Sequence, residues 1–400
     1  MVFAGIDWAD DHHDVVVLGH DAQLVGQIRV DHSAAGLGHL VRWLKQIAEP
    51  SSIACIIETR HGILVNTLLE AGFAVYPVNP KTVDRHRQAS RAKTDAIDAM
   101  ILARHGLHEI DRLRRLEPDN PIVQELKLLT RDQSTLIHQQ TRLLNQLTAC
   151  LKEYYPLALH LFTKLNQPVT LTFLQAYPTM EHLLAADPEH MATLFKRCRH
   201  PRPNQTVQKI LSLAQQPQLQ TNPVITRAKT RLMLAIVAQL TPLVDAIRAY
   251  DQEMERLFSA HSDSIIFQSF PGVGERLGPR LLAEWGDDRS RYASSESVAA
   301  LAGSSPVPFQ SGRFKRARKR FACVKSFRDA LYRMAWLSTR YEPWAYEYYK
   351  RKRAQGKSHS VAVRALSNIW VRIMFRAWMN REPYSRAKFL AAQATHARAA

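Results

Sequence analysis

The feature that most restricts the fold of this chain is a heptad-like pattern in its middle third. Apolar residues recur at alternating steps of four and three from Ile122 to Tyr154, over more than four heptads. Such spacing places one apolar stripe along a helix and is typical of a coiled-coil seam. A second run with similar spacing extends from Ile225 to Leu257. The pattern predicts two long helices that pair along these stripes, either within one chain or between two chains.

Three details of this region carry further predictions. Gln133 and Gln140 lie on the first seam, where a polar side chain costs stability and can fix the register or the number of partners. Pro242 lies inside the second run and is expected to kink or split that helix. Residues 160–222 are rich in Gln, Pro and His, which favours a small helical insertion with loops. We favour an arm used for dimerisation, and an ordinary helical hairpin is the alternative.

The N-terminal part of the chain has a different pattern. Three apolar stretches come first, between Val2 and Val30, and strands then alternate with helical segments. This order is typical of a mixed sheet covered by helices. The predicted fold class is therefore α/β for residues 1–116 and all-α beyond them, with a coiled-coil middle over 117–262 and a helical C-terminal domain over 263–400.

Four carboxylates mark the ends of elements in the predicted α/β domain. Asp7 lies on the first strand, Glu58 ends a strand expected to pair with it, and Asp95 and Asp98 lie one turn apart on a helix. Carboxylates three residues apart share a helix face and repel each other unless a cation lies between them. Hard cations such as Mg²⁺ prefer oxygen ligands, and two ions about 3.5–4 Å apart can stabilise the attacking and leaving oxygens of a phosphate. We predict two Mg²⁺ ions here; a turn cap and a solvated helix face are the alternatives.

The histidines, the cysteines and the apolar runs indicate which kinds of site and which cell compartment to expect. His12, His13 and His61 flank the acids. We favour polar loop residues, and metal binding or proton transfer is the alternative. The four cysteines lie far apart without a CxxC pair, so the sequence indicates neither a zinc site nor a disulfide framework. We see no transmembrane span of about 20 apolar residues and no secretory leader. We therefore expect a cytoplasmic protein without a membrane partner.

Positive charge is concentrated in the C-terminal third. Residues 263–400 hold 26 of the 54 lysines and arginines and 10 of the 36 acids, so they carry +16 of the total net charge of +18. A segregated basic region favours a polyanionic partner, above all nucleic acid. A ribosome-like or merely soluble basic surface is the alternative.

Gly272 and Gly274 stand in a Pro-Gly-Val-Gly segment between two predicted helices. This arrangement resembles the helix-hairpin-helix element that binds DNA. Glycines let the backbone approach a phosphate closely, and free N–H groups at the start of the next helix can hold that phosphate whatever the sequence. A purely structural turn is the alternative.

A serine precedes the most basic stretch of the chain. We expect residues 304–312 to form a rigid loop that presents Ser311 beside Gly312. Nearby cations stabilise the negative charge that builds on a transferring phosphate, and a serine nucleophile would conserve the bond energy in a phosphoserine ester. Ser-Gly is also an ordinary turn pair. The cations predicted to contact nucleic acid are Arg313, Lys315, Arg316, Arg318, Lys319 and Arg320.

The last segment is rich in aromatic residues. They recur from Tyr332 to Tyr349 and are followed by the basic run 350–353. Aromatic side chains beside cations can stack on nucleobases. At helical spacing they are also typical of an ordinary core, which we favour.

Together these motifs resemble a known family. Gly5-Ile6-Asp7, Glu58 and Lys93-Thr94-Asp95-x-x-Asp98-Ala99 resemble the RuvC-like DEDD domain. Leu301-Ala302-Gly303, followed by Pro306-Val307-x-x-Gln310-Ser311-Gly312, resembles the C-terminal domain of the IS110 insertion-sequence transposases. The resemblance covers nearly the whole chain. One departure is Arg60-His61, where a smaller Thr-Gly-like pair is expected.

The resemblance implies a RuvC-like RNase H fold, a coiled-coil segment and a serine-bearing transposase domain. It implies a recombinase that acts on double-stranded DNA, guided by a structured bridge RNA, as a dimer or tetramer. Asp7, Glu58, Asp95 and Asp98 would hold Mg²⁺, and Ser311 would attack DNA to form a 5′-phosphoserine intermediate. Two other functions stay open: a RuvC-like structure-selective endonuclease in which water attacks, and a non-catalytic nucleic-acid-binding protein.

Overall fold

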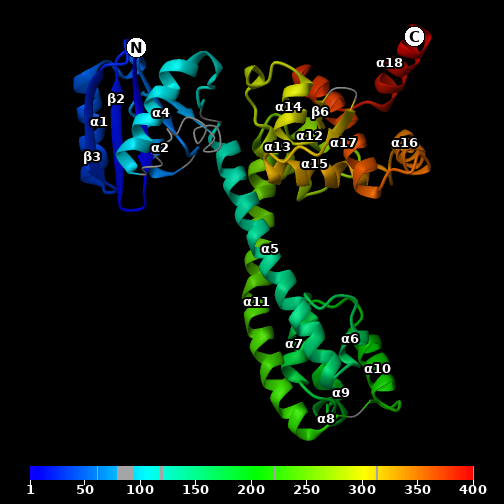
Figure 1. Cartoon of the computed structure of the whole chain (residues 1–400). Coiled ribbons are helices and arrows are strands. Elements are labelled where there is room, and N and C mark those ends of the chain that lie inside the picture. The colour runs from blue at the N-terminus through cyan, green and yellow to red at the C-terminus, as the bar shows by residue number, and fades with distance from the viewer. Residues whose placement is uncertain (61, 79–93, 118–119, 220, 312–313, 400) are drawn as a thin grey trace. The chain divides into compact units, whose positions relative to one another are not determined.

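The structure of the chain is a computed structural model (Figure 1). It describes residues 1–60, 62–78, 94–117, 120–219, 221–311 and 314–399. Contacts divide the chain into two compact units, Met1–Pro118 and Asp119–Ala400. The first unit is α/β and the second is largely helical, which agrees with the predicted division into an α/β part and an all-α part. The coiled coil and the helix-hairpin-helix stay predictions. The segments predicted as the middle and C-terminal domains both lie in the second unit.

The first unit contains a five-stranded sheet in the order β3-β2-β1-β4-β5. The first three strands are antiparallel, whereas β4 runs parallel to β1 and β5 parallel to β4. The elements are β1 (Val2–Trp8), β2 (His12–Leu18), β3 (Leu24–Asp31), α1 (Ala34–Ile47), the 3₁₀ turn η1 (Pro50–Ser52), β4 (Ile53–Ile57), α2 (Ile63–Glu70), β5 (Ala74–Pro77), α4 (Asp95–Glu109) and the 3₁₀ turn η3 (Ile110–Arg112).

Helices cover both faces of this sheet. Ala4 and Ile6 of β1 pack with α1 and α2 on one face, whereas Phe3 packs with Leu102 of α4 on the other. Successive side chains of a strand point to opposite faces. Gly5 and Asp7 therefore lie on the face covered by α4 (Figure 1).

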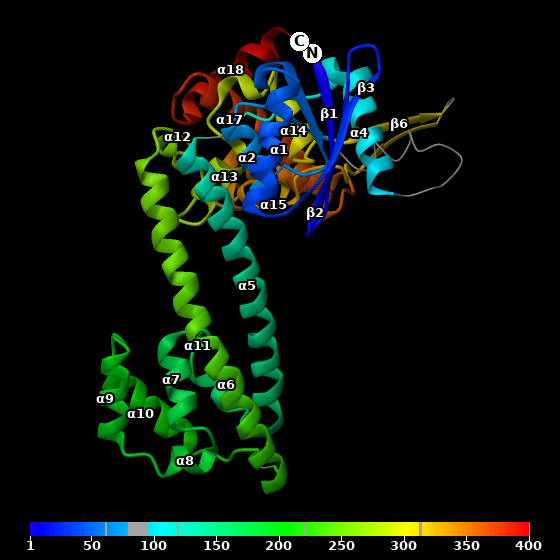
Figure 2. The ribbon, with the colours of Figure 1, turned by 90° about the vertical axis from the view of Figure 1, so that its left-hand side faces the viewer.

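Two long helices dominate one half of the second unit. They are α5 (Pro121–Tyr154) and α11 (Pro223–Ala260), which pack along each other within the single chain (Figure 2). Five short helices cluster at their far end and share a core with them, as the predicted insertion requires. These helices are α6 (Ala158–Leu161), α7 (Pro168–Ala176), α8 (Met180–Leu184), α9 (Pro188–Arg197) and α10 (Pro203–Ala214).

The predicted seams are only partly correct. On α5, the seam residues Leu126, Gln133 and Leu147 are fully buried. In the first half of α11 the buried positions are shifted by one residue, so that Met233 is buried while Leu232 is 47% exposed. The apolar residues there form two neighbouring stripes, one through Leu232 and one through Met233. Packing against the short helices α6 to α10 buries the stripe through Met233.

Another expectation about α11 is wrong in part, because Pro242 does not split this helix, which runs from Pro223 to Ala260. A kink at Pro242 stays a prediction. We also expected no segment long and apolar enough to cross a membrane, and α11 meets that test by length and composition. Its buried face packs against α5 and the distal helices, and one such helix is weak evidence for a membrane span.

The other half of the second unit is a helical core into which the near ends of α5 and α11 insert through Leu126 and Phe258. Its large buried side chains include Trp285, Trp370 and Trp378. Its elements are α12 (Ser264–Gln268), α13 (Leu277–Trp285), the 3₁₀ turn η4 (Arg289–Arg291), α14 (Ser295–Leu301), β6 (Val307–Ser311), β7 (Phe314–Arg318), α15 (Lys325–Ser338), α16 (Pro343–Ala354), α17 (His359–Met379) and α18 (Arg386–Ala399).

Candidate catalytic site

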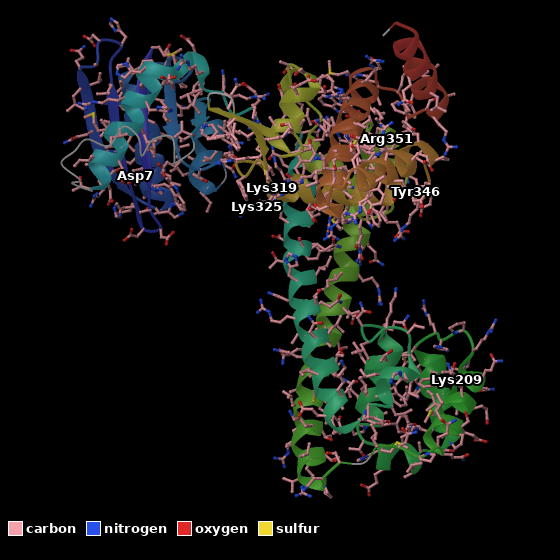
Figure 3. All side chains as sticks on the ribbon, turned by 45° about the vertical axis from the view of Figure 1, so that its right-hand side comes forward. Asp7, Lys209, Lys319, Lys325, Tyr346 and Arg351 are labelled. Carbon is pink, nitrogen blue, oxygen red and sulfur yellow. The ribbon has the colours of Figure 1, made fainter. Side chains whose placement is uncertain are left out.

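Asp7 lies near the end of β1, beneath α4 (Figure 3). A Cβ built on Gly5 would lie 2.0 Å from the carbonyl oxygen of Ala99 and 2.3 Å from the amide nitrogen of Ala103. Only glycine permits this approach of helix to strand. The Gly-Ile-Asp sequence therefore has two roles: it seats α4 on the sheet, and two residues later it places a carboxylate on the same face.

The first turn of α4 supplies two more carboxylates. Thr94 caps the helix, because its hydroxyl accepts a hydrogen bond from the backbone N–H of Ile97 at 3.4 Å. Asp95 and Asp98 follow within the first turn, where the positive end of the helix dipole favours negative charge. Both side chains are half-buried.

Glu58 comes from the neighbouring parallel strand. The register pairs Ile6 of β1 with Ile57 of β4, so Asp7 and Glu58 occupy the next positions at the same ends of adjacent strands. Glu58 is half-buried. The four acids predicted from the sequence thus come from β1, the end of β4 and the start of α4.

The carboxylates placed by these elements act on the pKa of Asp7. It is raised from 3.8 to about 6, first by burial and then by the negative charges of Asp98, Asp95, Glu58 and Asp14. Like charges this close disfavour ionisation of one another unless a cation offsets them. Several oxygen ligands crowded around a half-buried carboxylate fit a hard divalent cation.

Asp14 belongs to this cluster and was missed by the sequence analysis. It lies opposite Asp7 in the antiparallel register of β1 and β2, and its side chain is 10% exposed. Arg29 of β3 donates two hydrogen bonds to it, from Nη2 at 2.8 Å and from Nε at 3.2 Å. An aspartate directly before the apolar run Val15–Leu18 was the available signal, but the pairing that gives it meaning joins separate strands.

His12 also contacts the cluster. Its Nε2 lies 3.2 Å from Oδ2 of Asp95 and 3.6 Å from Oδ2 of Asp14. One ligand atom from each of His12, Asp14 and Asp95 lies within 4.8 Å of the others, an arrangement that can hold a metal ion. His12 and Asp14 share the face of β2 toward α4, because they are two residues apart on a strand.

The interpretation of the flanking histidines as loop residues is therefore wrong for two of them. His12 and His13 both lie on β2. His13 is buried and exchanges a hydrogen bond of 2.8 Å with the ring of His32, on the opposite face from His12. His61 lies outside the described residues.

The predicted serine lies in the second unit. Ser311 is the last residue of β6 and pairs with Phe314 of β7. The expected loop over 304–312 is wrong in part, since residues 307–311 form one strand of a two-stranded antiparallel hairpin. Gly312 and Arg313 lie outside the described residues, as do the side chains of Ser311, Lys315 and Arg316.

The described cations of the hairpin lie at its surface. Arg318 and Lys319 are exposed and Arg320 is half-buried. The guanidinium of Arg318 lies 4.2 Å from the ring centre of Phe309, which orders it on the exposed hairpin. These positions are consistent with contacts to a polyanion, which stay a prediction.

The two glycines of the predicted helix-hairpin-helix connect α12 to α13. Gly272 has a φ of +78°, and a Cβ there would lie 2.7 Å from Cβ of Leu337. Its conformation and this close contact require glycine. Around Gly274 nothing lies within 4 Å of an added Cβ, so this position leaves room for a phosphate. Phosphate binding at this turn stays a prediction.

Comparison with known proteins identifies the family. Residues 4–156 match a family model described as a transposase, and residues 265–350 match the model of the IS116/IS110/IS902 transposase family. The putative transposase of the IS117 mini-circle of Streptomyces coelicolor is 32% identical over 377 residues, which cover 92% of this chain and 91% of that protein. The chain belongs to the IS110 family of transposases.

Two further relatives are also proteins of insertion elements. An uncharacterized 42 kDa protein of IS900 from Mycobacterium paratuberculosis is 30% identical over 98% of this chain and 99% of its own length. An uncharacterized 44.8 kDa protein of IS116 from Streptomyces clavuligerus is 27% identical over 94% of both chains. The transposase domain of the family fits the RNase H-like order of the five-stranded sheet, and a DEDD domain implies use of a divalent metal.

Proposed function

We propose that this transposase is a Mg²⁺-dependent DNA recombinase that breaks and rejoins DNA through a 5′-phosphoserine at Ser311. The observation that supports it best is the crowding of carboxylates around the half-buried Asp7: burial first, and then the charges of Asp98, Asp95, Glu58 and Asp14, raise its pKa to about 6. Asp7, Glu58, Asp95 and Asp98 would hold two Mg²⁺ ions, and Asp14 and His12 would border the site. Bound Mg²⁺ would offset the charge of the scissile phosphate.

Ser311 carries the covalent step in this proposal. Its hydroxyl oxygen forms a bond to the scissile phosphorus, and the hydroxyl proton passes to water or to a carboxylate. The bond from phosphorus to the 3′ oxygen breaks, and that oxygen takes up a proton from water and leaves as a 3′ hydroxyl. In the second step a 3′ hydroxyl of another strand attacks the phosphoserine and releases Ser311 unchanged, so no bond energy is lost to water.

Nucleic acid would be held by the basic C-terminal third. Gly272 and Gly274 would contact the phosphate backbone, together with the cations of the hairpin: Arg313, Lys315, Arg316, Arg318, Lys319 and Arg320. We further propose that a bridge RNA guides the protein. The protein acts as a dimer or tetramer in the cytoplasm, and α5 and α11 are candidates for the contact between subunits. These points rest on the family resemblance and on the +16 charge of residues 263–400.

Strand transfer by the full-length chain tests this function. The substrates are DNA duplexes with the ends of the element, with and without RNA transcribed from its non-coding end. Ser311→Ala should abolish strand transfer, whereas Ser305→Ala, which removes a hydroxyl from the same segment, should preserve it. Cleavage that continues in Ser311→Ala would show that water attacks, as in a nuclease. Strand transfer that is equally fast without RNA would show that no RNA guides the protein. Strand transfer in excess chelator would show that no metal ion is needed.

A further inference from the structure

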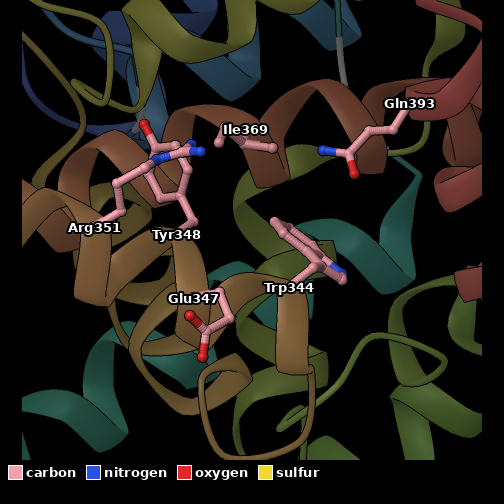
Figure 4. A pocket seen from close by; sticks show the side chains of 6 residues that line it. All are labelled: Trp344, Glu347, Tyr348, Arg351, Ile369 and Gln393. Atoms are coloured by element: carbon pink, nitrogen blue, oxygen red, sulfur yellow. The ribbon is translucent and has the colours of Figure 1, made fainter. Parts of the chain in front are cut away.

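A pocket in the second unit is lined by none of the residues of the proposed catalytic site. It is formed between α16, α17 and α18 and has a volume of about 320 Å³ (Figure 4). Ligand pockets in proteins begin at about this size. The lining residues are Trp344, Glu347, Tyr348, Arg351, Ile369 and Gln393.

One face of α16 supplies four of these six residues. Positions 344, 347, 348 and 351 follow the spacing i, i+3, i+4, i+7, which places them on one stripe of a helix. A stripe that packs into a core is normally apolar throughout. Here two aromatic rings alternate with a carboxylate and a guanidinium, so this face is built to combine ring contacts with polar contacts.

The aromatic wall of the pocket is fixed in place. The indole N–H of Trp344 donates a hydrogen bond of 3.2 Å to the hydroxyl of Tyr384. Its ring centre lies 4.8 Å from that of Trp370 and 4.5 Å from that of Phe389. Trp344 nevertheless remains partly exposed. A ring held this way offers a stacking surface whose side-chain entropy is already lost.

Polar groups line the rim of the pocket. Glu347, Arg351 and Gln393 are exposed, and the guanidinium of Arg351 lies 5.3 Å from the ring centre of Tyr348 (Figure 4). An ionised carboxylate only accepts hydrogen bonds, whereas an amide both donates and accepts. Among the described residues, Glu347 forms no ion pair or hydrogen bond within the chain, so its carboxylate is available to a ligand.

We propose that this pocket receives a single unpaired nucleobase that carries an exocyclic amino group. Trp344 and Tyr348 stack on the base, as aromatic side chains do in single-strand binding sites. Glu347 accepts a hydrogen bond from the amino group, a contact that cytosine, adenine and guanine can make and that thymine and uracil cannot.

The surroundings of the pocket favour a nucleotide over a free base or another aromatic ligand. Arg351 belongs to the basic run 350–353 at the end of α16, which can contact the flanking phosphates. Lys350 lies 5.2 Å from the ring centre of Tyr346 and adds a second aromatic and cation pair on this helix. The inference requires that the chain acts on nucleic acid, and it is independent of Ser311 and of the metal.

Binding of bulged duplexes to the full-length chain tests this site. Three short labelled duplexes of the same sequence carry an unpaired cytosine, an unpaired thymine or no unpaired base, and fluorescence anisotropy is measured with chelator present to prevent cleavage. We expect the cytosine bulge to bind about tenfold more tightly than the thymine bulge, the effect of one good base contact. Equal affinity for the three duplexes would overturn the proposal.

Four variants separate the pocket from general electrostatics. Tyr348→Ala should weaken binding of the cytosine bulge about tenfold and leave the paired duplex unaffected, whereas Tyr346→Ala should change all three duplexes alike. Glu347→Gln should abolish the preference for cytosine, whereas Glu382→Gln, which removes the same charge outside the pocket, should retain it. Because Glu347 is exposed, its variant tests the site even if Tyr348→Ala unfolds. If Glu347→Gln still binds the cytosine bulge more tightly than the thymine bulge, Glu347 does not recognise the amino group of the base.

Discussion

Gly5 of β1 and Ala99 of α4 lie so close that a Cβ on Gly5 would be 2.0 Å from the carbonyl oxygen of Ala99. This contact seats the helix that carries Asp95 and Asp98 directly on the strand that carries Asp7. The charges of these three residues then act on one another, as the raised pKa of Asp7 shows. The glycine of the Gly-Ile-Asp motif is therefore a positioning residue for the carboxylates.

Gly5→Ala should destabilise the protein and impair strand transfer. The added methyl must displace α4, and overpacking of this kind costs about 1–3 kcal/mol. The free energy of unfolding from urea denaturation measures the first effect. Gly38→Ala in α1 is the matched control, because its Cβ meets only Nη1 of Arg42 at 3.4 Å and a helical alanine should raise stability slightly. Wild-type stability and activity in Gly5→Ala would show that α4 is not held by this contact.

Asp7 should make metal-free stability fall as pH rises. Its pKa in the folded chain is raised from 3.8 to about 6, so the folded state holds this proton more tightly than the unfolded state. The resulting stabilisation is complete below 3.8 and disappears as pH passes through about 6. In chelator at about pH 7.5, Asp7→Asn should therefore melt at or above the wild-type temperature, whereas Asp21→Asn, at an exposed turn, should not change it.

With Mg²⁺ added, the wild-type protein should melt at a higher temperature than Asp7→Asn. Mg²⁺ should raise the wild-type melting temperature more at about pH 7.5 than at about pH 5, because protons compete with the metal for the carboxylates. In Asp7→Asn the increase should be much smaller. An equal Mg²⁺ effect in both proteins would remove Asp7 from the metal site.

Arg29→Ala should lower the free energy of unfolding by about 1–3 kcal/mol, because it leaves the buried carboxylate of Asp14 without its two hydrogen-bond donors. Adding Asp14→Asn to the Arg29→Ala variant should restore part of the lost free energy of unfolding. A double-mutant cycle measured by denaturation gives the coupling between the two residues. A coupling near zero would mean that the pair is only a surface contact.

Gln133→Leu should be destabilising although it places an apolar residue on the seam. Gln133 is fully buried, donates to Oδ1 of Asp251 at 2.6 Å and accepts from Nη2 of Arg280 at 3.0 Å. Leucine would leave both partners short of a hydrogen bond, at about 1–3 kcal/mol. Gln140→Leu is the control, since Gln140 is partly exposed, and it should be neutral or stabilising. If both substitutions change the melting temperature equally, the hydrogen bonds of Gln133 do not contribute to stability.

Local patterns in the sequence predict much of the α/β unit. Alternation along β1 places Asp7 and Gly5 on one face, and the helical spacing of Asp95 and Asp98 places both in one turn. Asp14 escaped notice because its partners, Asp7 and Arg29, come from two different strands. Which acids meet is decided by strand register, which depends on turn geometry and on the pairing of separate strands.

Elsewhere the sequence was ambiguous for identifiable reasons. Two prolines near Ser311 favoured a loop, yet Pro308 lies on β6 of an isolated two-stranded hairpin, where a missing N–H is tolerated at an edge. In α11 the choice between Leu232 and Met233 as the buried stripe depends on the distal helices, whose packing the heptad pattern does not contain.

Mapping of the covalent adduct tests the central claim most directly. The full-length chain is incubated with DNA and Mg²⁺, digested with protease and nuclease, and analysed by tandem mass spectrometry. The proposal predicts a nucleotide phosphate on Ser311, dependent on Mg²⁺ and absent from Asp7→Asn. Strand transfer that proceeds with the modification on another residue, or with no protein–DNA adduct at all, would contradict it.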